Sequence, residues 1–138
     1  MKWQEIKPKT TRRRAGRLKP SGVWSSTTGY QVARADLKVP GSGWAVWAMT
    51  PTGWRRLFAD VHLADAADAM SIAALEYRRR IVIAALPPIA LRLVSLVRRA
   101  ALMLPVDRVV DTIVAADPTG ARSSRLLGEY MKAVIRGD

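Results

Sequence analysis

Arginine and tryptophan side chains gather in the stretch 29–70, and these residue types carry most of the chemistry that the sequence offers. Three of the chain's five tryptophans lie there, together with three arginines. A guanidinium group can donate paired hydrogen bonds to a guanine edge, and an indole ring can stack on an unpaired base. The candidate nucleic-acid contacts in this stretch are therefore Arg34, Trp47, Arg55 and Arg56.

A second set of candidate contacts lies in the strongly basic segment 1–21. Eight lysines and arginines against Glu5 alone give this segment +7 of the chain's net charge of +12. Its apolar residues are too scattered to bury a face, so we expect a basic arm that is unfolded when free. Such an arm can bind phosphates or enter a minor groove. Its candidate contacts are Arg12, Arg13, Arg14 and Arg17. A tail that serves only solubility is the alternative interpretation.

Residue types that carry out catalysis are sparse. The chain has no cysteine, which excludes thiolate chemistry and cysteine-based metal sites, and it has no Walker-type or GxGxxG phosphate loop. His62 is the only histidine, and no second group converges on it by a recognised spacing. The pairs Asp65 with Asp68 and Asp107 with Asp111 are better explained as solvated helix faces than as metal ligands. We therefore expect no enzyme activity and no cofactor.

Alternation of period two between turn signals predicts the strands that would carry the first set of contacts. Strands are expected over 29–39, 44–49 and 54–59, and a short additional strand could occupy 22–28. One face of such a sheet must pack on a helix, which leaves the other open. The strand period lets Arg34 and one of Arg55 or Arg56 share the open face, and alternation alone does not decide which one. The alternative is that these arginines only discourage edge-to-edge association of sheets.

The pattern changes to a helical period after the last strand. We expect a helix over 62–86, which Pro87-Pro88 stops, and further helices over 89–104, 105–116 and 123–135. The segment 89–104 is apolar nearly all round, so its own chain or a partner should bury it. A small bundle or a dimer interface is the favoured interpretation of 87–138, and a helix-turn-helix is the alternative.

The apolar run 81–104 is long enough to be considered as a membrane span. It contains two prolines together with Arg92, Arg98 and Arg99, and one arginine at mid-bilayer costs about 2.5–3.5 kcal/mol. A core segment is the better interpretation, with an in-plane amphipathic anchor as the alternative. No apolar run of signal-peptide kind follows the basic N-terminus. We therefore expect a cytoplasmic protein without an integral membrane span.

The order strand–strand–strand–helix over residues 22–86 resembles the DNA-binding domain of plant ethylene-response factors. It is also similar to the related arm-type DNA-binding domains at the N-termini of phage integrases. The resemblance rests on the segments 29–34, 43–47, 54–58 and 63–66. It implies a sheet that enters a major groove, with Arg34, Trp47, Arg55 and Arg56 touching DNA. The Ala-, Arg- and Trp-rich composition is similar to that of small proteins of actinobacterial phages.

These inferences predict an α+β fold with a small three-stranded antiparallel sheet packed on a helix, followed by a C-terminal helical segment. The expected parts are a flexible basic arm (1–21), a sheet-plus-helix module (22–86) and a helical segment (87–138) that could form a homodimer. The expected function is that of a non-enzymatic nucleic-acid-binding protein, with double-stranded DNA preferred over RNA. The alternative is an interaction protein whose apolar helices bind a host or structural protein.

Overall fold

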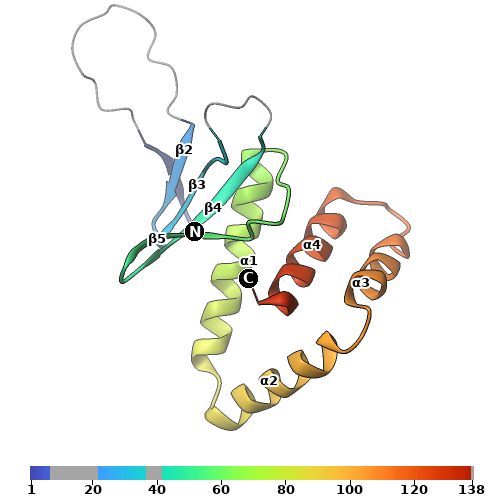
Figure 1. The fold of residues 1–138 in the computed structure, drawn as a ribbon. Helices are drawn as coiled ribbons and strands as arrows, with labels where there is room; N and C mark the ends of the chain where they lie inside the picture. Colours follow the sequence, from blue (N-terminus) through green and yellow to red (C-terminus); the bar gives the residue numbers. More distant parts are fainter. Residues whose placement is uncertain (7–21, 37–41, 138) are drawn as a thin grey trace, which may run out of the picture. The chain divides into compact units, whose positions relative to one another are not determined.

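The computed structural model describes residues 1–6, 22–36 and 42–137. In these residues five strands precede four helices, so the general α+β class is as expected. The expectation of a three-stranded sheet is wrong, because the sheet has five strands in the order β1-β2-β3-β4-β5, each antiparallel to its neighbours (Figure 1). The strands are β1 (Trp3–Glu5), β2 (Val23–Ser26), β3 (Tyr30–Arg34), β4 (Trp44–Thr50) and β5 (Gly53–Leu57).

The edge strand β1 comes from the segment that the sequence assigns to a basic arm. It pairs with β2, and backbone hydrogen bonds close both ends of this pairing. The Ile6 N–H donates to the Val23 carbonyl at 2.8 Å, and the Thr27 N–H donates to the Lys2 carbonyl at 3.1 Å. Three residues are too few to display a period of two, so no sequence pattern distinguishes such a strand from coil.

Compact packing divides the chain into two units, and the division falls inside α1 (Ala66–Ala85). The sheet unit comprises Met1–Leu57 and His62–Met70, and the helical unit comprises Phe58–Val61 and Ser71–Asp138. Sequence patterning places the boundary after residue 86, because Pro87-Pro88 is the strongest break in the helical pattern. The proline pair ends a helix without ending a compact unit.

One face of the sheet carries the core of the sheet unit. Cα pairing across β3, β4 and β5 puts five buried side chains on this face, which are Tyr30, Val32, Val46, Ala48 and Leu57. We call it the core face. Beyond the end of β5, the Trp44 N–H donates to the Leu63 carbonyl at 2.8 Å, so the segment after β5 continues the pairing along β4.

The first helix begins at Ala66, four residues later than the sequence predicts. The Asp65 side chain accepts a hydrogen bond from the Asp68 N–H at 2.9 Å, which satisfies one of the free donors of the first turn. Asp65 is therefore the residue that caps α1, and His62 lies outside the helix. An aspartate is a far better cap than a histidine, and this preference decides where the helix starts.

The helical unit contains α2 (Pro88–Leu102), α3 (Val106–Ala115) and α4 (Arg122–Arg136), each within two residues of its expected ends. Helices α3 and α4 approach closely at Gly128, where an added Cβ would lie 2.7 Å from Cγ2 of Val114. Ion pairs join the same two helices, with Lys132 Nζ 2.6 Å from Asp111 Oδ1 and Arg136 paired with Asp107. Close packing thus joins the two helices at the end nearest their connecting loop, and ion pairs join them at the middle and at the other end.

No helix in the described residues has both the length and the apolar character that a membrane crossing requires. The apolar run 81–104 is interrupted between α1 and α2, where Pro87 and Pro88 end one helix and begin the next.

Candidate nucleic-acid interface

The face opposite the core face carries an unbroken row of polar and aromatic side chains across all five strands. Successive Cα partners define this row from β1 to β5, and partners on paired strands share a face. We call it the polar row, and its members are Gln4, Ser25, Gln31, Trp47 and Arg56. Neighbouring strands lie about 4.8 Å apart, so the row spans roughly 19 Å.

The face that bears the polar row, here the open face, is partly exposed. Arg56 and Gln4 are exposed, and Trp47 and Gln31 are half-buried. A second exposed pair, Met49 and Trp54, follows on β4 and β5. None of the described strand residues on this face is acidic. Amide groups, a guanidinium and indole rings therefore form a surface that can donate to a polyanion and stack on bases.

Arg34 and Arg55 lie on the core face, at its exposed margins. Arg34 is the Cα partner of Trp44, and Arg55 is the partner of the buried Ala48. Arg34 and Arg55 share a face, which is one of the two registers that the sequence allowed. The expectation that their shared face is the open face is wrong. The turn between β4 and β5 fixes the register, and a shift of one residue would exchange the two faces. Arg56 is accordingly the strand arginine of the open face.

Arg34 already has an aromatic neighbour within its own sheet. Its guanidinium carbon lies 6.0 Å from the centre of the Trp44 ring, a cation–π contact worth about 0.5–1 kcal/mol at an exposed site. This contact holds the Arg34 side chain over Trp44. The four candidate arginines of the basic segment, Arg12, Arg13, Arg14 and Arg17, lie outside the described residues.

A small polar recess of about 260 Å³ adjoins Arg34, and sequence reasoning did not find it. Its walls include Trp44, His62 and Gly43. Gly43 has a φ of +82°, and a Cβ there would lie 3.0 Å from the Leu63 carbonyl oxygen, so only glycine lets the two segments come this close. Arg34 and His62 are 28 positions apart and meet only because β4 pairs with the segment after β5, a pairing that leaves no local sequence signal.

The recess has the donors to hold a phosphate oxygen or water. Among the described residues that line it, Arg34 and His62 are the titratable side chains. Across residues 1–6, 22–36 and 42–137, no three His, Cys, Asp or Glu side chains come together in a way that could hold a metal ion.

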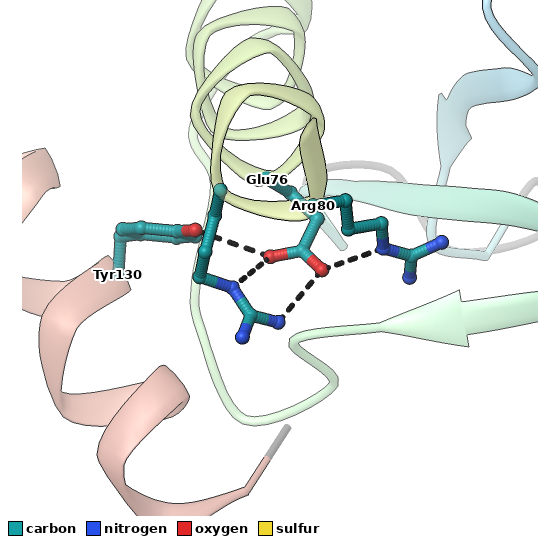
Figure 2. Close-up of polar contacts among 4 residues, drawn as sticks. Glu76, Arg80 and Tyr130 are labelled. Atoms are coloured by element: carbon teal, nitrogen blue, oxygen red, sulfur yellow. Dashed lines mark hydrogen bonds and ion pairs between the residues drawn. The ribbon is translucent and has the colours of Figure 1, made fainter. Parts of the chain in front are cut away.

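A buried ionised cluster lies in the helical unit, around Glu76 of α1 (Figure 2). The Glu76 side chain is only 1% exposed, and its carboxylate accepts four hydrogen bonds. Arg79 donates from Nε and Nη2 at 2.9 Å each, Arg80 Nε donates at 2.8 Å, and the Tyr130 hydroxyl of α4 donates at 3.1 Å. The Tyr130 ring also packs edge-on against Phe58, with ring centres 5.4 Å apart.

The pKa values in this cluster follow from its geometry. Burial by itself would raise the pKa of Glu76, but the hydrogen bonds from Arg79 and Arg80 outweigh burial and lower it below its ordinary value. Burial, followed by the Glu76 charge, raises the pKa of the Tyr130 hydroxyl. Glu76 is therefore ionised at neutral pH with its acceptor positions occupied, and it fastens α1 to α4 rather than offering a free base.

A scan of the chain against models of protein families found no match, and searches of curated proteins and of solved structures likewise found none.

Proposed function

We propose that this chain is a non-enzymatic nucleic-acid-binding protein that lays the open face of its sheet against double-stranded DNA. The observation that carries this proposal is the polar row, in which the side chains of Gln31, Trp47 and Arg56 stand side by side on adjacent strands. Arginine pairs with guanine and glutamine with adenine through two hydrogen bonds each, so the row offers base-reading groups on one surface.

The dimensions of the sheet indicate which part of it would dock. The major groove of DNA is about 12 Å wide, whereas five strands span roughly 19 Å, so the whole sheet cannot lie flat in the groove. Three adjacent strands span roughly 10 Å and do fit. Strands β3, β4 and β5 carry Gln31, Trp47 and Arg56, and β5 is an edge strand that can lead the entry.

The charge of the chain supports the same proposal. A net charge of +12 in 138 residues attracts polyanions and accelerates association with them. In the sheet unit, Arg34 and Arg55 stand on the core face, outside the polar row, and the basic segment contributes four further arginines at positions 12, 13, 14 and 17. Arginines of the basic segment that bind phosphates would add affinity without sequence preference, whereas Arg34 and Arg55, on the opposite face, would add only long-range attraction.

The sharpest test compares two neighbouring arginines that face opposite ways. Arg56→Ala removes the guanidinium of the polar row, and Arg55→Ala is the matched control, with the same charge change one residue earlier on the same edge strand. We expect Arg56→Ala to weaken binding of a duplex about tenfold, because a good base contact is worth about 1–3 kcal/mol. Arg55→Ala should weaken it less than about twofold, since it loses only a screened surface charge.

Fluorescence anisotropy with labelled duplex DNA, single-stranded DNA and duplex RNA measures these effects. Equal losses of affinity for the two variants would show that the open face does not contact DNA. A wild-type protein that binds none of the three nucleic acids would overturn the proposed function. Preference for the single strand would instead assign the indole rings to base stacking.

The basic arm is tested by substitution and not by truncation, because β1 within it belongs to the sheet. Replacing Arg12, Arg13, Arg14 and Arg17 together with serine should make the dependence of log K on log salt shallower by up to about 3–4, at roughly 0.9 per phosphate contact. An unchanged salt dependence would limit the arm to a role in solubility.

Binding of a protein partner is the second candidate function. The observation that favours it is confined to the helical unit, where α2 has no buried residue although most of its side chains are apolar. Water-exposed apolar surface of this extent is typical of an interface.

A further inference from the structure

Helix α2 presents an unusually exposed apolar surface. Ile89, Leu93, Val94, Leu96 and Val97 are between 46% and 70% exposed. At about 100° per residue these five positions fall within an arc of about 160° on the helix. The polar residues Arg92, Ser95 and Arg99 lie on the opposite side of the helix. The apolar arc therefore has the width of a helix face that packs against other helices, and it is not covered by the described residues.

The apolar arc borders a groove of about 690 Å³ within the helical unit. Three helices supply the floor and walls of the groove. The lining includes Val82 of α1 and Leu86 just after it, Val94 and Val97 of α2, and Val134 of α4. The Arg98 Nε–H donates to the Ile135 carbonyl at 3.1 Å and holds α2 beside α4. The groove is thus a formed feature of the fold, lined mainly by aliphatic side chains from separate elements, together with Arg78, Arg79 and Arg98.

We propose that this surface binds a second copy of the same chain, with α2 of each copy packed against the α1–α2–α4 groove of the other. The groove requires an occupant with a broad uncharged apolar helix face, and α2 has such a face. In a twofold arrangement the same patch serves on both copies, so a groove and a matching helix on one chain complete the interface. Arg92 and Arg99 of α2 stay on the outer side, whereas Arg98 lines the groove and is held there by its hydrogen bond to the Ile135 carbonyl.

The apolar area agrees with what a stable dimer buries. A fully exposed aliphatic side chain presents roughly 100 Å² of apolar surface on the transfer scale. At the observed exposures, the five α2 residues and Val82 contribute together roughly 350 Å². A standard interface buries about 800 Å² per partner, of which slightly more than half is apolar, so this patch supplies most of the apolar area that such an interface needs.

Sedimentation equilibrium of the full chain, after removal of nucleic acid in high salt, tests the proposal directly. We expect the wild type to be a dimer at micromolar concentration. Val97→Lys should raise the dimer dissociation constant at least about 100-fold, because the dimer would bury two ammonium groups in grooves already lined by Arg78, Arg79 and Arg98. Ser95→Lys is the matched control on the polar side of α2 and should leave the dimer intact. Val97 is 68% exposed in the single chain, so its substitution leaves the monomer fold in place, which circular dichroism verifies.

A cross-linking experiment tests the geometry independently of affinity. The chain contains no cysteine, so Val97→Cys and Ser95→Cys each introduce a single thiol. A short bismaleimide should join two Val97→Cys chains rapidly and two Ser95→Cys chains slowly, because only the former thiols approach each other near the twofold axis. A monomeric wild type, or equal cross-linking rates, would overturn the proposal. The DNA-binding assay of the Arg56 variant does not depend on this outcome, so either proposal can fail alone.

Discussion

Replacing Glu76 with glutamine should lower the free energy of unfolding by about 2–3 kcal/mol at neutral pH. Glutamine has nearly the same volume as glutamate, so the substitution changes the charge and the hydrogen bonds without leaving a cavity. The effect should be large because the Glu76 carboxylate is buried and accepts four hydrogen bonds, two on each oxygen.

The magnitude follows from which donors glutamine can still satisfy. Its carbonyl can accept the two bonds on one side, and its NH₂ group then faces two donors on the other. The Tyr130 hydroxyl can rotate and become an acceptor, whereas the Arg79 Nε–H has no such freedom. One charge-assisted bond is lost and the others weaken, at about 1.5–3 kcal/mol for a bond to a charged group. The side chains of Arg79 and Arg80 are 34% and 45% exposed, so water offsets part of this loss.

The difference in the free energy of unfolding between wild type and Glu76→Gln should shrink as the pH falls. The pKa of Glu76 is lowered in the folded chain, so the unfolded chain binds the proton more readily. The stability that the charge contributes is therefore fully present above the unfolded-state pKa of about 4.3, and it disappears as the pH falls through the folded-state pKa. Other carboxylates titrate equally in both proteins, so the difference isolates Glu76.

Urea unfolding followed by circular dichroism, at neutral pH and at several acidic pH values, measures the loss of stability and its dependence on pH. Glu129→Gln is the matched control, because Glu129 is half exposed and its partner Lys132, 2.9 Å away, keeps Asp111 as a second partner; it should cost less than about 1 kcal/mol. A Glu76→Gln loss no larger than the control loss, or a loss that does not shrink in acid, would refute the account of the buried cluster.

Two further predictions concern glycines that permit close approach. Gly128→Ala should destabilise the chain by about 1 kcal/mol, because the clash with Val114 outweighs the gain in helix propensity; in a Val114→Ala background the same substitution should become neutral or stabilising in urea unfolding. Gly43→Ala should cost more than Gly53→Ala in the same assay. Both positions have positive φ, but only at Gly43 would the new Cβ press on the Leu63 carbonyl oxygen, so equal losses would contradict the packing described there.

Several elements were predictable because their signals are local. The helices of the C-terminal region follow from the spacing of apolar residues and from prolines, which act on the residues next to them. Strands β3, β4 and β5 follow from alternation between glycine and proline turns. Strand β1 was missed because Trp3–Glu5 is stabilised by its partner β2 and has no pattern of its own. The start of α1 lies later than the expected residue 62 because the Asp65 side chain caps the first turn.

The candidate interface likewise combines residues that local patterns indicate with residues that only the tertiary structure brings together. The sequence placed Trp47 and Arg56 among the candidate contacts, and both lie on the open face; it also expected Arg34 on that face, where the structure does not put it. Gln4, Ser25 and Gln31 of the polar row were not among the candidate contacts, because an isolated glutamine or serine has no functional signature. They form a row only when five strands are in register.

By itself, the sequence determined the strong positive charge, the lack of cysteine chemistry, the α+β composition and the positions of most helices, because each depends on residue types or on neighbours a few positions apart. The tertiary structure alone decided which arginine stands on the open face, which side chains complete the polar row, and that the described residues leave α2 uncovered. Those properties depend on strand register and on packing between distant segments, where one residue of shift turns every side chain of a strand to the other face.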